Sequence, residues 1–214
     1  MFGLDNLEPI TLVAVLVAFV VGITIHEFSH AWSALLLGDN TAERQGRVTL
    51  NPISHLDPIG SIGVLVIAVF GFGIGWGRPV PVNPSRVRWR QRGLAITAIA
   101  GPVSNLVIAT AFVIPLRIVD TATIDPNIIT IATYMVLVNL LLASFNLIPV
   151  PPLDGHKILV GILPNFWYQY LAPLERYGIG ILLVLIMSSF LFGGSILRAM
   201  YEPPFQALSS LMLG

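Results

Sequence analysis

Residues 9–37 read PITLVAVLVAFVVGITIHEFSHAWSALLL, and this stretch decides the fold. No Asp, Glu, Lys or Arg occurs from Pro9 to Ile25, and a continued apolar helix would cross the roughly 30 Å hydrocarbon core of a bilayer. The segment HEFSH (26–30) follows in the same helix, and Gly38 then provides a stop signal. The stretch predicts a membrane-spanning helix with ionisable groups, which are costly in a membrane and by default mark a functional site.

The HEFSH segment has the spacing of a metal site. Its two histidines lie four residues apart, so on a helix both imidazoles project from one face and can reach one metal ion. Glu27, beside the first histidine, can accept a proton from metal-bound water. A polar contact between helices is the structural alternative. A haem with two axial histidines does not fit, because those ligands come from opposite sides of the ring.

A catalytic zinc ion usually has three protein ligands plus water, so a third ligand is expected elsewhere in the chain. Asp154 is favoured, because it ends the proline-rich segment NLIPVPPLDG (146–155), where the prolines break a helix and Gly155 permits an unusual turn. Its carboxylate would also offset part of the metal's charge. His156 is the second choice, and a helix cap before Lys157 is the structural alternative for Asp154. The remaining candidates are His55, Asp57, Glu43 and Asp39.

The composition is that of a membrane protein. The chain is 55% hydrophobic and 10% charged, with a mean hydropathy of +0.84, whereas about a quarter of the residues in soluble domains are charged. The net charge of zero gives no electrostatic case for nucleic-acid binding, and the absence of cysteine excludes disulfides and thiolate ligands. We expect one membrane-embedded domain over residues 1–214, with a catalytic core at about 10–160 and a C-terminal transmembrane helix at about 175–198 followed by a tail.

Apolar runs predict an all-α polytopic membrane protein with about four transmembrane helices. After the first helix, the candidate spans are residues 93–116, 126–148 and 177–197. The tail at 200–214 contains two prolines and then a short apolar segment, for which we expect an interfacial helix.

Residues 58–77 are uncharged but contain six glycines, which weaken a helix. One interpretation is a flexible spanning helix. The other is a re-entrant or peripheral element, which is permitted at membrane depth only where protein or water covers its backbone. Residues 46–50 (GRVTL) and 79–83 are candidates for a short β element.

The metal hypothesis constrains the topology. The HEFSH segment lies near the C-terminal end of its helix and Asp154 follows the C-terminal end of another, so the two helices must run in the same direction. One span between them, at 93–116, satisfies this condition, and a further span at 60–76 would violate it.

The loops 38–92 and 155–176 then share one face. That face holds nine of the basic residues, namely Arg44, Arg47, Arg78, Arg86, Arg88, Arg90, Arg92, Lys157 and Arg176. Only Arg117 and Arg198 remain for the other face, so the positive-inside rule makes the first face cytoplasmic and puts the N-terminus outside the cell membrane.

Three segments together resemble the motifs of the site-2 protease family of intramembrane zinc metalloproteases. They are HEFSH (26–30), GPVSN (101–105) and NLIPVPPLDG (146–155), and NPISHLDP (51–58) and GRPVPVN (77–83) resemble a compact prokaryotic branch without PDZ or CBS domain. By that resemblance, His26, His30 and Asp154 bind zinc and Glu27 is the catalytic base. It also implies that Asn105 and Asn146 hold the substrate backbone or polarise its carbonyl, while His55 either lies close to the metal or braces its loop.

The resemblance implies a zinc-dependent intramembrane endopeptidase with one Zn²⁺ ion, which hydrolyses peptide bonds within or near the transmembrane segments of membrane proteins (regulated intramembrane proteolysis). Its partners would be transmembrane substrates and the lipid bilayer, and the oligomeric state is left open. A helical substrate must unwind to expose its carbonyls, and an edge near 47–50 or 79–83 could pair with the unwound strand. Two alternatives remain, which are a membrane protein that binds or transports metal and a catalytically inactive scaffold of the same fold.

Overall fold

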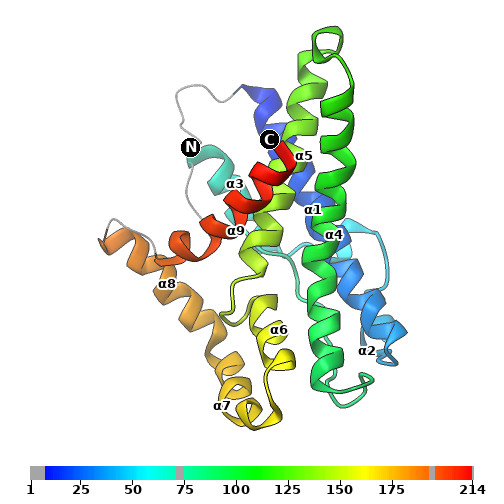
Figure 1. Ribbon diagram of the computed structural model, residues 1–214, viewed down its shortest axis with the longest axis vertical. Helices are drawn as coiled ribbons and strands as arrows, with labels where there is room; N and C mark the ends of the chain where they lie inside the picture. Colours follow the sequence, from blue (N-terminus) through cyan, green and yellow to red (C-terminus); the bar gives the residue numbers. More distant parts are fainter. Residues whose placement is uncertain (1–7, 71–74, 193–195, 214) are drawn as a thin grey trace.

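The computed structural model describes residues 8–70, 75–192 and 196–213, and these form helices and loops without a β-sheet (Figure 1). The helices in chain order are α1 (Pro9–Leu36), α2 (Thr41–Arg44), α3 (Pro58–Phe70), α4 (Gln91–Ile118), α5 (Pro126–Asn146), α6 (Asp154–Ile162), α7 (Tyr168–Leu171), α8 (Gly178–Phe192) and α9 (Ile196–Leu213). Short 3₁₀ turns lie at 52–54, 121–123, 165–167 and 172–177.

Four stretches of the described chain are long and apolar enough to cross a membrane, namely α1, α4, α5 and residues Asn165–Ser188. The expected class of a helical, multi-pass membrane protein is therefore confirmed. The fourth stretch begins earlier than predicted, because the backbone stays helical through Glu175 and Arg176, where the charges indicated a loop.

Helices α1, α4 and α5 form the central bundle. Ala18, Ile108 and Met135 meet in one buried cluster, which joins one residue from each helix. Helices α1 and α5 run downward in Figure 1, whereas α4, which lies between them in the sequence, runs upward. The C-terminal end of α1 and the chain that leaves α5 therefore lie at the same end of the molecule, as a shared metal site requires.

The end of α1 has a local cause. Gly38 adopts a φ of +96°, and the N–H of Asp39 donates to the carbonyl of Ala34 at 2.9 Å. This is the Schellman arrangement, in which a left-handed residue after the helix lets two backbone groups turn back onto its last turn. The stop predicted at this position is confirmed.

The glycine-rich run does not continue as one long helix. Helix α3 has 13 residues, which at about 1.5 Å per residue is shorter than a bilayer core of roughly 30 Å. Leu56 and Gly77 form an antiparallel bridge, and the N–H of Arg78 donates to the carbonyl of His55 at 2.7 Å. The two ends of the run therefore meet, and α3 is not among the four candidate spans. Four of its residues, 71–74, lie outside the described residues.

The expected strands at 46–50 and 79–83 are absent from the described residues, so this prediction was wrong. Gly46 ends α2 with a φ of +66°, and the N–H of Arg47 donates to the carbonyl of Ala42 at 2.9 Å. This segment therefore caps a helix instead of joining a ladder. The N–H of Val80 donates to a side chain, as described below, and the isolated Leu56–Gly77 bridge is the only β pairing in the described part of the chain.

The tail also differs from the expected short interfacial helix. Helix α9 is continuous from Ile196 to Leu213 and contains Pro203 and Pro204. Its Phe205, Leu208 and Met212 pack against the cluster of α4 and α5 residues around Leu140. The apolar face of α9 therefore belongs to the bundle, because it covers side chains that α4 and α5 would otherwise expose.

Candidate metal centre

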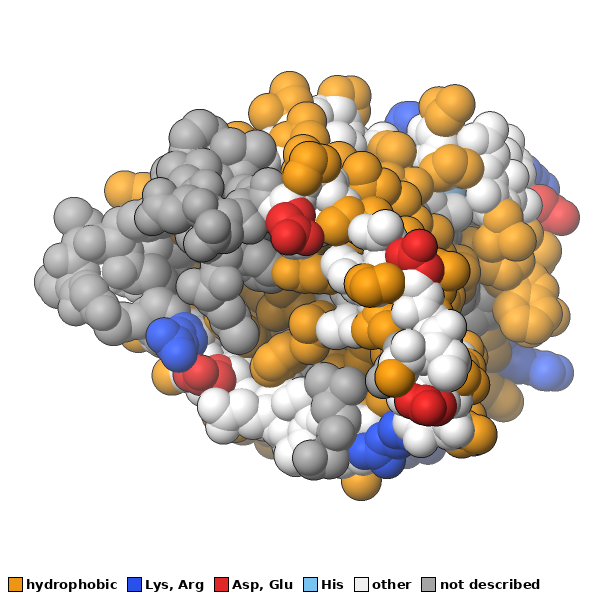
Figure 2. All heavy atoms as spheres, turned by 90° about the horizontal axis from the view of Figure 1, so that it is seen from above, with side chains coloured by type: hydrophobic (Ala, Val, Ile, Leu, Met, Phe, Trp, Pro, Cys, Tyr) orange, Lys and Arg blue, Asp and Glu red, His pale blue; other side chains and the backbone are white. Residues whose placement is uncertain are grey.

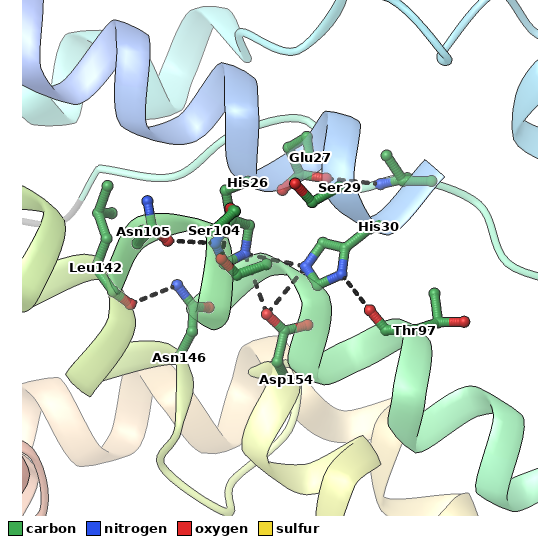
Figure 3. Close-up of polar contacts among 12 residues, drawn as sticks. His26, Glu27, Ser29, His30, Thr97, Ser104, Asn105, Leu142, Asn146 and Asp154 are labelled. Atoms are coloured by element: carbon green, nitrogen blue, oxygen red, sulfur yellow. Dashed lines mark hydrogen bonds and ion pairs between the residues drawn. The ribbon is translucent and has the colours of Figure 1, made fainter. Parts of the chain in front are cut away.

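Three potential metal ligands converge at the end of the bundle where α1 stops (Figure 3). The Nε2 atoms of His26 and His30 lie 3.0 Å apart, and each lies 3.1 Å from Oδ2 of Asp154. All three side chains are buried. Asp154 is 128 and 124 residues from the two histidines, so only the tertiary fold brings the three together.

Asp154 reaches this position because α6 starts directly against the end of α5. It is the first residue of α6, whose cap is Leu153, and its side chain makes no capping bond. The cap interpretation is therefore wrong, and the carboxylate faces the histidines instead. A Cβ added at Gly155 would collide with the carbonyls of Leu147 and Ile148. Gly155 is needed for this close approach and not, as the sequence suggested, for an unusual backbone conformation.

Each histidine is held through its other ring nitrogen. Nδ1 of His30 lies 2.7 Å from the carbonyl of Thr97, and Nδ1 of His26 lies 2.6 Å from Oδ1 of Asn105. Both partners are acceptors, so each Nδ1–H donates, and Nε2 is the ring nitrogen that faces the site. In this arrangement both Nε2 atoms are placed to bind one metal ion.

The amide of Asn105 is fully engaged. Its Nδ2 donates to the carbonyl of Gly22 at 3.2 Å and to Oδ1 of Asn139 at 2.9 Å, and the residue has no exposed surface. These two donations orient Oδ1 toward His26. Asn139 was missed by the sequence reasoning, although a lone amide in the middle of the apolar run 126–146 was a usable signal.

Glu27 lies beside the two histidines and is 8% exposed. Its Oε2 accepts a hydrogen bond from the N–H of Val80 at 3.1 Å. Arg47, 5% exposed, donates to the carbonyls of Arg78 and Pro79 and thereby holds this loop in place. The roles of Arg47 and Val80 were not predicted. They depend on contacts between a side chain and a backbone group that lie 31 and 53 residues apart in the chain, and such contacts leave no local pattern in the sequence.

The donor set fits zinc. Bond lengths of about 2.0–2.2 Å in a tetrahedral site put ligand atoms roughly 3.3–3.6 Å apart, a few tenths of an ångström beyond the separations of 3.0 and 3.1 Å in the structure. An ionised carboxylate and two neutral imidazoles would bind the ion.

Gly101 of α4 leaves space beside the two imidazoles, because a Cβ at this position would lie 2.6 Å from Nε2 of His26.

The other predicted residues do not belong to the group of three potential ligands. Nδ2 of Asn146 donates to the carbonyl of Leu142 in its own helix at 2.9 Å, although the residue is close to the site in Figure 3. His55 is fully buried, and its Nε2 donates to the carbonyl of Thr49 at 2.7 Å. His156 is buried but does not join the ligand group found among the described residues.

The acidic candidates for the third ligand have other partners. Asp39 accepts hydrogen bonds from Thr41 and from the N–H of Asn83. Asp57 accepts two from the first turn of α3. Both are therefore occupied in the local structure around α1 and α3.

Comparisons with known proteins agree with this site. The model of "Peptidase family M50" matches residues 113–189, which include Asp154. The chain is 37% identical over 187 residues to "Putative zinc metalloprotease YwhC" of Bacillus subtilis, covering 84% of this chain and 83% of that protein. It is 32% identical over 193 residues to "Putative zinc metalloprotease Rip2" of Mycolicibacterium smegmatis, covering 86% and 72%.

A protein named Rip2 from Mycobacterium tuberculosis is 30% identical over 186 residues, covering 85% of this chain and 69% of its own length. No solved structure matches the chain. The matches to these relatives extend over most of both chains, and the fold brings together the three side chains that the sequence predicted as metal ligands. This chain belongs to peptidase family M50, the site-2 protease type of zinc metalloprotease.

Proposed function

We propose that this chain is a zinc-dependent intramembrane endopeptidase, which cleaves membrane proteins within or near their transmembrane segments. One observation carries the proposal. Glu27 is an acidic residue that does not belong to the group of potential ligands. It lies beside this buried group of two histidines and one aspartate, near the end of helices that are long and apolar enough to span a membrane. A site for metal storage or transport has no need of such a base, and neither has a scaffold.

A single zinc ion held by His26, His30 and Asp154 would supply Lewis-acid chemistry, lowering the pKa of water and polarising a peptide carbonyl. Glu27 is the general base of the proposal. The hydrogen bond from the N–H of Val80 engages Oε2 and orients the carboxylate, so Oε1 is the atom that takes the proton from water. The same group would then return the proton to the leaving amine.

The asparagines divide between two roles. Asn105 acts on His26, because its two amide hydrogens are already donated to Gly22 and Asn139. It could contact a substrate carbonyl only by breaking one of these bonds. Asn146 uses one amide hydrogen within α5 and is half-buried, so it remains our candidate for substrate binding. His55 braces its loop through Thr49.

The proposed orientation puts the metal centre near the cytoplasmic face and the N-terminus outside. Residues 38–92 and 155–176 carry nine of the 11 basic residues, and the metal centre lies near the end of α1 that leads into the first of these segments. Figure 2 looks onto the opposite end, where hydrophobic side chains predominate and charged ones of both signs are scattered among them. The meeting of Leu56 and Gly77 supports a re-entrant placement for the intervening α3.

Substrate binding must use a site that is not a preformed sheet edge. Residues 79–83 form no strand, and the N–H of Val80 is already donated to Glu27. A substrate segment that has unwound can therefore pair with this loop only at other backbone groups. Substrates with helix-weakening residues in their spans fit such a site best, because their carbonyls become accessible at lower cost.

Glu27→Gln tests the proposal. Purified protein should keep one zinc per chain, while cleavage of a membrane-embedded reporter falls at least a hundredfold. Asp154→Ala should lose the zinc as well as the activity. Continued turnover by Glu27→Gln would refute the hydrolytic role of Glu27, and loss of zinc from it would assign Glu27 to the ligands.

A further inference from the structure

The turn before α4 is the most basic segment of the chain. Residues 86–92 read RVRWRQR, with four arginines and no acid. All four arginines are exposed, and Trp89 is 62% exposed. Nothing in the metal centre uses these side chains, so their arrangement needs a separate explanation.

The backbone of this turn is held in one conformation. The N–H of Arg88 donates to the carbonyl of Leu37 at the end of α1, at 2.8 Å. Val87 is 3% exposed and packs against the first turn of α4, where a Cβ added at Gly93 would lie 2.5 Å from Val87 Cγ1. Trp89 and Arg90 have φ values of +62° and +46°, a region that residues other than glycine rarely adopt. Such strain persists where surrounding contacts impose it and is frequent at binding sites.

The charge of the turn is not neutralised by the protein. In the described part of the chain, no carboxylate lies within ion-pairing distance of these four guanidinium groups. Arg86 reaches Oδ1 of Asn40 at 3.3 Å, and the guanidinium of Arg88 lies 5.8 Å from the ring centre of Trp89. The turn therefore presents several positive charges to an external anion.

Its position selects the kind of anion. Helix α4 has 28 residues, more than the roughly 20 that cross a hydrocarbon core, so its first turn stands at the edge of the membrane. Tryptophan concentrates at this depth, and clusters of basic residues beside a span attract anionic lipids. Guanidinium groups also bind phosphate oxygens with two parallel hydrogen bonds.

We propose that residues 86–92 bind the headgroups of anionic phospholipids, with the arginines on the phosphates and Trp89 among the headgroups. The proposal does not depend on the protease activity, because it uses no residue of the metal centre. It predicts that the protein distinguishes lipids of equal chain length by the charge of their headgroup.

The test uses the full chain in dodecylmaltoside, titrated with dimyristoyl phosphatidylglycerol or phosphatidylcholine while the midpoint of thermal unfolding is followed. Phosphatidylglycerol should raise the midpoint at much lower concentrations than phosphatidylcholine. In the triple variant R88Q/R90Q/R92Q the apparent affinity for phosphatidylglycerol should fall roughly a hundredfold, because each arginine near an anionic surface contributes about fivefold. The matched control R44Q/R117Q/R176Q removes the same charge from exposed positions elsewhere and should behave as the wild type.

Three outcomes would overturn the proposal. Equal effects of the two lipids on the wild-type protein would show no headgroup preference, and this comparison does not require any variant to fold. An equal loss in the control variant would assign the effect to net charge. Stabilisation by inorganic phosphate at the concentration of the lipid would identify the ligand as a free anion instead of a lipid.

Discussion

Gly101→Ala should disable the metal centre by adding one methyl group. The new Cβ would lie 2.6 Å from both Cε1 and Nε2 of His26 and would also contact Nε2 of His30. Ordinary contacts begin at about 3.4 Å, so the imidazoles must withdraw by roughly 0.8 Å or α4 must shift by as much. Metal sites tolerate deviations of about 0.2 Å in bond length, so a withdrawal of this size breaks a ligand bond.

We expect zinc affinity to fall about a hundredfold, which corresponds to about 2.8 kcal/mol. The assay is competition with a chromophoric chelator, together with the zinc content of the purified protein. Gly180→Ala in α8 is the matched control, because a Cβ there meets nothing within 4 Å. In a helix interior the same substitution favours folding by about 0.5–1 kcal/mol, so poor helix propensity cannot explain a loss. Wild-type zinc affinity in Gly101→Ala would refute the placement of the two imidazoles against α4.

The remaining predictions concern the groups that hold the ligands and the base. Asn105→Ala removes the acceptor that orients His26, so zinc affinity should fall about 10–100-fold in the chelator assay, whereas Asn139→Ala should cost less because Asn139 acts only through Asn105. An equal loss in both variants would contradict this order. Arg47→Met releases the loop that orients Glu27, so reporter cleavage should fall about tenfold with zinc content unchanged and should recover in part in Arg47→Lys. Zinc loss in the Arg47→Met protein would instead show that the loop supports the ligands.

Several features of the fold followed from local patterns. The apolar runs located α1, α4 and α5 to within a few residues, because burial in lipid demands long uninterrupted apolar helices. The stop after α1 followed from Gly38, whose left-handed conformation other residues adopt at a cost. The expected strands at 46–50 and 79–83 failed because a strand needs a partner. Their backbone groups found partners at a helix end and at Glu27.

The sequence by itself predicted the chemistry that we propose for this protein. Residues four apart on a helix share a face whatever the rest of the chain does, so the pairing of His26 with His30 and the place of Glu27 beside them were readable in HEFSH. The proline-rich segment favoured Asp154 as the third ligand, but only the tertiary structure decided that its carboxylate, and not that of Asp57 or Asp39, faces the histidines. The same holds for the bonds that orient His26 and Glu27, because contacts between distant helices and loops depend on packing and leave no spacing to read.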